Sequence, residues 1–248
     1  MGVLVEICSC SVEDVLESEK GGAQRVELCT ALPLGGLTPT AATIFESKRL
    51  SKLPLMVMIR LRSGGFCYSE VELATMERDI EVATELGADG FVFGVLTEKG
   101  FVDRKRTKRL IERAGKLETV FHRAFDVTPD PFDALETLID LGVTRLLTSG
   151  QKAASLQGAP LIKQLVERAD RRIEVMPGGG VRVENVAEIV GITGCRQVHL
   201  TAHRGHLDTS TYANRSIAFG SDSAPSEDRV DVIDPAVVAE IVAAAQRL

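Results

Sequence analysis

Carboxylates and thiols occur with one spacing in two short segments near the N-terminus of the chain. Glu6 and Cys8 lie two residues apart in the first segment, and Glu27 and Cys29 repeat that spacing in the second. Residues two apart in an extended strand point to the same face of a sheet. The carboxylates are therefore candidates for general acid/base chemistry, and the thiols are candidates for binding a soft metal ion.

The thiols of Cys8 and Cys29 are the candidate metal ligands. Neighbouring strands lie about 4.8 Å apart, so sulfurs at the ends of two such strands can reach a single ion. Two thiolates suit two-coordinate Cu(I), whereas a closed zinc site needs two further ligands. The alternative is that both cysteines pack in the core as small apolar residues. We expect Cys10, Cys67 and Cys195, which lie on other segments, to take no part in such a site.

Basic side chains and a histidine follow other runs of strand-like sequence. Arg60 ends the third run, and His122 and Arg123 lie at the end of the fifth. Because an unpaired buried charge is costly, we expect Arg60 and Arg123 to pair with Glu6 and Glu27. The arrangement is interpreted either as an ion-pair network that fixes the interior or as a catalytic or ligand-binding site, in which histidine is the usual proton carrier.

Three consecutive glycines, Gly178, Gly179 and Gly180, follow the seventh strand-like run. Glycine allows backbone N–H groups to approach an anion closely, and many barrels bind phosphate with the loops that follow strands seven and eight. Ser149, after the sixth run, is placed to assist. These residues predict a possible anion site, although a tight turn between a strand and a helix would also explain the glycines.

Strand-like and helical patterns alternate along the whole chain. Ser11 opens a capping box, and Pro131 and Pro235 each follow an aspartate at a helix start. The expected strands are 3–8, 25–29, 55–60, 90–93, 118–122, 145–148, 173–176 and 197–200. Helices are expected to open at Ser11 and Thr38 and to cover 69–86, 103–114, 130–141, 156–170, 182–190 and 237–247.

Eight such units predict an α/β protein whose parallel sheet closes into a (β/α)8 TIM barrel, as one domain over 1–248. An open doubly wound sheet would need only five or six units. In a barrel the strand ends meet at one mouth, so we expect Glu6, Glu27, Arg60, His122 and Arg123 to converge there. The long polar segment 203–231 is interpreted either as a lid over this mouth or as a loop packed down the side of the barrel.

Composition excludes several classes of protein. The 248 residues carry 29 basic and 35 acidic side chains, a net charge of −6, and they lack the basic stripe of a nucleic-acid binder. The densest basic stretch, 104–113, is interpreted as a solvated helix face. No apolar run approaches the roughly 18–20 residues of a membrane span, and the N-terminus lacks a signal-peptide pattern. We expect a cytoplasmic protein with reduced thiols, as a monomer or homo-oligomer.

Five blocks of sequence, in order along the expected units, resemble the CutC copper-homeostasis family. They are 21–29 (GGAQRVELC), 35–39 (GGLTP), 121–126 (FHRAFD), 147–150 (LTSG) and 176–180 (MPGGG). The resemblance implies a (β/α)8 barrel, a cytoplasmic location and a link to copper through cysteine thiolates, with no organic cofactor. The family's proposed Cu(I) ligands fall on Cys8 and Cys29.

Some positions depart from the family pattern. After the third strand the family usually reads Arg-Pro-Arg-Gly-Gly-Asp-Phe, whereas this chain reads Arg-Leu-Arg-Ser-Gly-Gly-Phe over 60–66. Leu200 and Thr201 replace the Ser-rich residues that follow the histidine. Two functions are therefore considered. One is copper homeostasis with Cu(I) on Cys8 and Cys29, and the other is a lyase, isomerase or hydrolase acting on a small anionic or phosphorylated substrate at the mouth.

Overall fold

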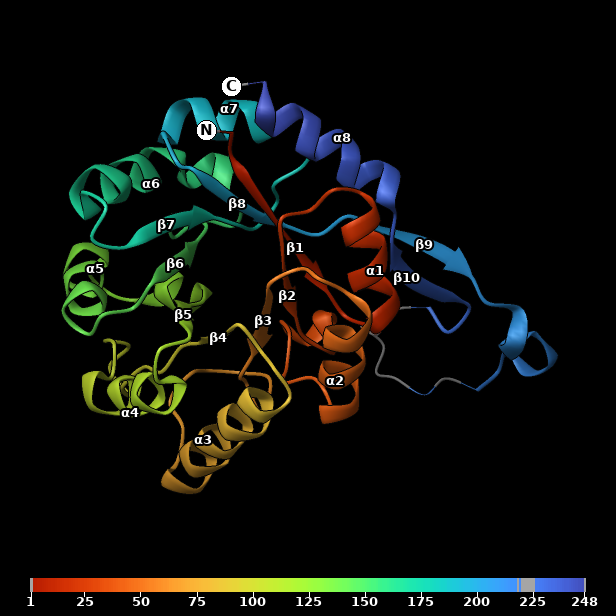
Figure 1. The fold of residues 1–248 in the computed structure, drawn as a ribbon, viewed down its shortest axis with the longest axis horizontal. Coiled ribbons are helices and arrows are strands. Elements are labelled where there is room, and N and C mark those ends of the chain that lie inside the picture. The colour runs from red at the N-terminus through yellow and green to blue at the C-terminus, as the bar shows by residue number, and fades with distance from the viewer. Residues whose placement is uncertain (1, 218, 220–225, 248) are drawn as a thin grey trace.

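Eight parallel strands run side by side around a barrel, and helices cover its outside (Figure 1). The structure is a computed structural model that describes residues 2–217, 219 and 226–247. The strands neighbour one another in the order β7-β6-β5-β4-β3-β2-β1-β8. A parallel bridge between Gly178 and His199 joins β7 to β8 and closes the sheet. The predicted (β/α)8 barrel is confirmed.

Each expected unit supplies one strand and one helix. The barrel strands are β1 (Leu4–Ser9), β2 (Arg25–Leu28), β3 (Leu55–Met58), β4 (Gly90–Phe93), β5 (Glu118–Phe121), β6 (Arg145–Thr148), β7 (Glu174–Pro177) and β8 (Gln197–Leu200). The helices are α1 (Val12–Lys20), α2 (Ala41–Leu50), α3 (Glu70–Glu85), α4 (Arg104–Ala114), α5 (Pro131–Asp140), α6 (Ser155–Ala169), α7 (Val186–Thr193) and α8 (Pro235–Gln246). Short 3₁₀ helices cover Leu32–Leu34, Arg123–Val127 and Thr209–Asn214.

Side-chain caps fix most helix starts where the sequence indicates them. Ser11 accepts a hydrogen bond from the backbone N–H of Asp14 at the start of α1. The expected start at Thr38 is wrong, because the Thr38 hydroxyl accepts from the backbone N–H of Arg60, and Thr40 caps α2 instead. The helix expected from residue 182 begins only at Val186, since 182–185 form a turn.

The alternation along the strands separates two buried layers. On β1, Val5 and Ile7 face the helices, within the apolar layer that surrounds the barrel. The opposite faces of the strands fill the barrel interior with a second apolar cluster: Cys8, Cys29, Met56, Met58, Val92, Val120, Leu147 and Met176. The inward direction expected for the Glu and Cys side chains is therefore observed.

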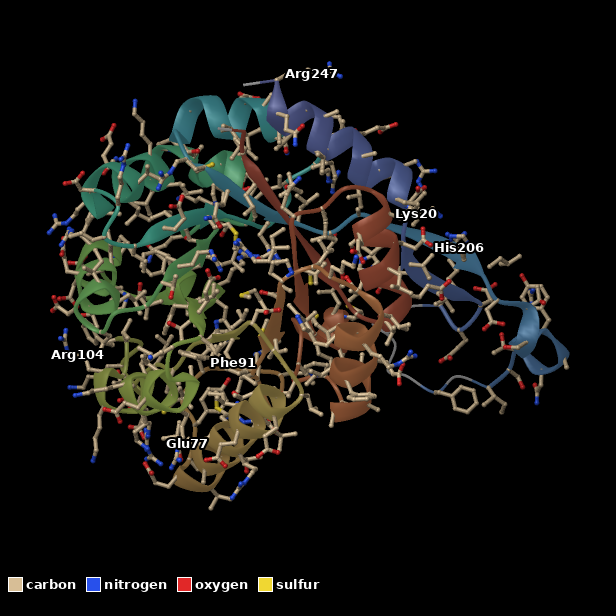
Figure 2. All side chains as sticks on the ribbon, viewed as in Figure 1. Lys20, Glu77, Phe91, Arg104, His206 and Arg247 are labelled. Carbon is tan, nitrogen blue, oxygen red and sulfur yellow. The ribbon has the colours of Figure 1, made fainter. Side chains whose placement is uncertain are left out.

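The basic stretch on α4 pairs with acidic residues of α3. Arg109 donates to both carboxylate oxygens of Glu77, at 2.9 and 3.0 Å. Arg113 lies 2.9 Å from Glu81, so the pairing continues along the two helices. Figure 2 shows Glu77 and Arg104 at the outer edge of the molecule, far from the barrel centre. The stretch is thus a solvated, ion-paired helix face.

The segment after β8 forms a hairpin that projects beside α1 (Figure 1). Its strands, β9 (His203–Leu207) and β10 (Arg229–Ile233), pair antiparallel, and Ile233 N–H donates to Asp14 Oδ1 at 2.9 Å. Residues 218 and 220–225 of the expected loop lie outside the described residues. The described part starts beside α1, projects away from the barrel (Figure 1) and lines no part of the cavity at the mouth. No helix in the described ranges is long and apolar enough to cross a membrane.

Candidate functional site

A cavity of about 570 Å³ opens at the carboxyl ends of the strands. This volume lies within the range of roughly 300–1,000 Å³ that is typical of small-molecule sites. Its polar and charged lining comes from five strand ends or the loops after them: Glu27, Arg60, His122, Arg123, Arg182, His199 and Thr201. The sulfur-bearing residues Cys8, Cys29 and Met58 complete the inner part of the lining.

The cavity collects most of the residues that the sequence predicts for a site. Its lining includes the following of them: Cys8, Glu27, Cys29, Arg60, His122, Arg123, Gly179 and Gly180. Three predicted residues lie behind the lining. Glu6 is one layer deeper in the barrel, Gly178 forms the bridge to β8, and Ser149 contacts Arg123.

Glu6 is part of a buried charge layer beneath the cavity. It is 1% exposed and forms an ion pair with Arg25, while its Oε1 accepts from His199 Nδ1 at 2.8 Å. Burial alone would raise the pKa of Glu6, but Arg25 and His199 outweigh it and lower the pKa to about 2. The expected pairing of Glu6 with Arg60 or Arg123 is wrong, because the strand register places Arg25 directly beside Glu6.

Glu27 lies above this layer and has one free oxygen. Its Oε1 is 3.9 Å from His199 Nε2, and its Oε2 is buried with no hydrogen-bond partner among the described residues. Burial is the main reason that the pKa of Glu27 is raised to about 7. Burial alone would lower the pKa of His199, but the carboxylates of Glu27 and Glu6 raise it overall. Glu27 can therefore give or take a proton near neutral pH.

His122 is a neutral hydrogen-bond donor on the cavity wall. The backbone N–H of Ala124 donates to Nδ1 at 3.2 Å, which assigns the ring proton to Nε2. Nε2 is buried and has no acceptor within the described ranges. Burial and the neighbouring Arg60 lower the pKa of His122 to about 3, so the ring stays neutral at physiological pH. Such an imidazole can polarise a carbonyl or hold an anion without carrying charge itself.

Arg60 is a buried cation whose partners are backbone carbonyls. It donates to the carbonyls of Leu34, Gly36 and Gly64 at 2.9, 3.1 and 3.0 Å. Its guanidinium lies 5.3 Å from the ring centre of Phe66, which in turn lies 5.0 Å from the His122 ring. No carboxylate of the described chain forms an ion pair with Arg60. The predicted pairing of Arg60 with Glu27 is therefore also wrong.

Three thiols form one cluster at the inner end of the cavity. Cys29 Sγ lies 3.7 Å from Cys8 Sγ and 3.7 Å from Cys10 Sγ. The expectation that Cys10 lies apart from these two thiols is wrong, because Cys10 contacts Cys29. Cys10 follows the last residue of β1 and lies two residues beyond Cys8. Hydrogen bonds from Cys29 and Cys8 lower the pKa of the Cys10 thiol to about 4, and contact with Cys10 raises the pKa of each partner.

Two groups of mixed ligands surround this thiol cluster. Cys8 lies with Glu27 and His199, all buried, and their ligand atoms are within 4.8 Å of one another. Cys10 lies in the same way with Asp14 and His203 on the outer side. The sequence places His199, His203 and His206 around the end of the last strand, where they could supplement a metal site. It does not identify the partners of His199 and His203, because these come from distant strands and helices.

The glycine turn after β7 presents free backbone donors to the cavity. Gly179 and Gly180 have φ angles of +94° and +72°, which L-residues with side chains rarely adopt. Their N–H groups have no acceptor in the part of the chain that the structure describes. Arg123 lies against Gly179 and is held by Asp126 Oδ2 and Ser149 Oγ, both at 2.8 Å. Ser149 thus positions Arg123 and does not itself line the cavity.

The fold and this site define a (β/α)8 barrel with a ligand cavity at the carboxyl ends of its strands. The chain belongs to the CutC family, whose family model matches residues 3–204. A CutC family protein of Treponema denticola is 46% identical and the alignment covers 93% of this chain and 94% of the relative. The human copper homeostasis protein cutC homolog is 42% identical, covering 100% and 90% of the two chains.

Solved structures agree with the fold. A crystal structure of CutC from Streptococcus agalactiae has a TM-score of 0.77 and 39% identity, and it covers 80% of this chain and 98% of its own. Phosphoribosylanthranilate isomerase from Pyrococcus furiosus has a TM-score of 0.59 at 15% identity, covering 99% and 100%. The second likeness shows a shared barrel architecture and nothing about function.

Proposed function

We propose that the protein binds Cu(I) through the thiolates of Cys8 and Cys29, with Cys10 as a third ligand. The observation that carries the proposal is the contact of both Cys8 and Cys10 with Cys29 at 3.7 Å between sulfurs. The human and mouse relatives named copper homeostasis proteins support a role in copper homeostasis.

The sulfur spacing favours three ligands over two. With a metal–sulfur bond of about 2.3 Å, three thiolates around one ion lie about 4.0 Å apart, and two opposed thiolates lie about 4.6 Å apart. The observed 3.7 Å is nearer to the first arrangement. A shift of a few tenths of an ångström would then admit the ion, whereas linear coordination by Cys8 and Cys29 needs a larger opening.

The surroundings of the cluster suit a soft monovalent ion. Cys8 and Cys29 are buried in an interior that also contains the thioethers of Met56, Met58 and Met176. Sulfur ligands favour Cu(I) over harder ions. Cys10 is half-buried and gives the cluster an outer edge through which copper can enter. Since free thiols persist in reducing compartments, we expect the protein to work in the cytoplasm.

A competition titration tests this proposal. Under anaerobic reducing conditions, the wild-type protein should take one equivalent of Cu(I) from a chromogenic Cu(I) chelator. The double variant Cys8→Ser with Cys29→Ser should lose this binding while its circular dichroism spectrum stays unchanged. Cys67→Ser is the matched control, because Cys67 lies outside the thiol cluster, and it should bind like the wild type. Equal copper uptake by wild type and double variant, or none by either, would reject the proposal.

A further inference from the structure

Two buried donors belong to side chains that line the cavity, Arg60 and His122. Arg60 Nε and His122 Nε2 both lack an acceptor among the described residues, and both side chains belong to residues that are only 5% exposed. Phe66 lies against both of them and holds them on the same wall. Unpaired buried donors are rare in proteins, and here both belong to residues that line one cavity.

The charge of Arg60 makes this wall anion-selective. Three backbone carbonyls accept from three of the four N–H groups on its terminal nitrogens, but carbonyls do not neutralise a full positive charge. A buried cation without a counter-ion is unfavourable, and a bound anion would remove that cost. Nε of Arg60 and Nε2 of His122 supply two donors, which suit the two oxygens of a carboxylate.

The glycine turn forms a second anion-binding surface at the rim. Successive N–H groups of Gly179, Gly180 and Val181 have no acceptor in the described ranges, and all three residues line the cavity. Successive backbone N–H groups in a turn can bind an anion. Arg123 lies over this turn, and Arg182 follows it directly and has no ion-pair partner in the described part of the chain. Several backbone N–H groups together with two guanidinium groups suit a tetrahedral phosphate.

We propose that the cavity binds a small phosphorylated carboxylic acid. Its phosphate occupies the rim against the amides of 179–181, Arg123 and Arg182, and its carboxylate reaches Arg60 and His122. This ligand goes beyond copper binding, because its contacts involve no sulfur. Arg60 and Arg182, which form no ion pair among the described residues, supply positive charge for the carboxylate and the phosphate. Arg123 is already paired with Asp126 and contributes N–H donors.

Isothermal titration calorimetry with simple probes tests both ends of this ligand. The probes are 2-phosphoglycolate, inorganic phosphate and glycolate, at pH 7. We expect 2-phosphoglycolate to bind at least tenfold more tightly than phosphate. Arg182→Met should lower the affinity for 2-phosphoglycolate and for phosphate about tenfold. Arg60→Met should make the affinity for 2-phosphoglycolate equal to that for phosphate. Arg104→Met, on the outer face of α4, is the control and should leave all three affinities unchanged. No binding at about 10 mM, or equal affinity for phosphate and 2-phosphoglycolate, overturns the proposal.

Arg60 also donates to three loop carbonyls, so Arg60→Met can disturb the loops as well as remove a ligand contact. A measurement on the wild-type protein distinguishes these two effects. The chain has four histidines, whose ring nitrogens are resolved by ¹⁵N NMR. Adding 2-phosphoglycolate should shift the Nε2 resonance of His122 and leave that of His206 on the hairpin in place. A titration in which the His122 resonance does not move would overturn the proposal, whatever the variants show.

Discussion

His199 Nδ1 lies 2.8 Å from Glu6 Oε1, and the other ring nitrogen of His199 faces Glu27 across 3.9 Å. One imidazole thus connects a carboxylate of the buried layer with a carboxylate of the cavity. Arg25 holds the second oxygen of Glu6, so each oxygen of Glu6 has its own hydrogen-bond partner. The chemistry of the cavity therefore depends on Glu6 and Arg25, which lie beneath its lining.

Replacing Glu6 tests the strength of this layer. Glu6→Gln removes the negative charge but keeps the shape, and it leaves Arg25 buried at 4% exposure without a counter-ion. Breaking one side of a buried pair costs about 3–5 kcal/mol, so the free energy of unfolding in urea should fall by that amount. Glu46→Gln, which removes an exposed partner of Arg49, should cost less than about 1 kcal/mol. Equal losses in the two variants would contradict a stabilising role for the layer.

The neutral state of His122 predicts a loss of stability in acid. The pKa of His122 is about 3 in the fold and has an ordinary value of 6.5, so only the unfolded chain gains this proton between those values. The contribution of neutral His122 to the free energy of unfolding is fully present above pH 6.5. It declines by up to about 1.4 kcal/mol per pH unit as the pH falls below that value. The stability difference between wild type and His122→Gln, from urea unfolding, should therefore shrink from pH 6.5 to pH 4. A difference that is constant with pH would refute this assignment.

Glu27 predicts the opposite dependence. Its pKa of about 7 exceeds the ordinary 4.5, so the folded protein holds this proton more tightly than the unfolded chain. The stability that protonated Glu27 contributes is present below pH 4.5 and is lost as the pH rises through 7. In urea unfolding, the free energy of unfolding of Glu27→Gln should exceed that of the wild type by the largest amount above pH 7. If the two curves stay parallel from pH 4 to pH 8, Glu27 does not titrate in this range.

Cys10 should be the most reactive thiol of the chain. Its lowered pKa makes it a thiolate at neutral pH, and thiolates rather than thiols react with alkylating agents. Limited iodoacetamide treatment at pH 6, followed by peptide mass spectrometry, should label Cys10 before Cys67. Both residues are half-buried, so access alone does not favour Cys10. Stoichiometric Cu(I) should protect Cys10, and preferential labelling of Cys67 would contradict the assignment.

The sequence predicts which face of a strand each residue occupies, but it does not predict the register, that is, which residues of neighbouring strands lie side by side. Alternation along β1 and β2 is sufficient to place Glu6, Cys8, Glu27 and Cys29 inside the barrel. The partner of Glu6 depends on register, which pairs it with Arg25. Register is set by packing of the whole barrel, so the sequence does not distinguish Arg25 from residues farther along the chain, such as Arg60, as that partner.

Other features were missed for different physical reasons. Cys10 follows the last residue of β1, and extending the alternation by one step would have added it to the thiol cluster. The hairpin was missed because β9 (HRGHL) has no apolar alternation, although β10 (RVDVI) alternates polar and apolar residues over its first four positions. Most side chains of both strands face solvent. The partners of Arg60 are backbone carbonyls of loops, whose path follows from turns such as the one at Gly36, with φ of +79°. No residue pattern reports such contacts.

The bridge from Gly178 to His199 also determines when the barrel can close during synthesis, because it joins the last two barrel strands. Glu6 and Arg25 are made early in synthesis, but His199 follows Glu6 by 193 residues. Contacts between such distant parts of a chain form late, since closing a long loop costs entropy. While the ribosome still holds the last strand, Glu27 has no imidazole beside it and the barrel has an open edge. A nascent chain therefore carries all three thiols of the cluster for some time before it has the finished cavity in which they belong.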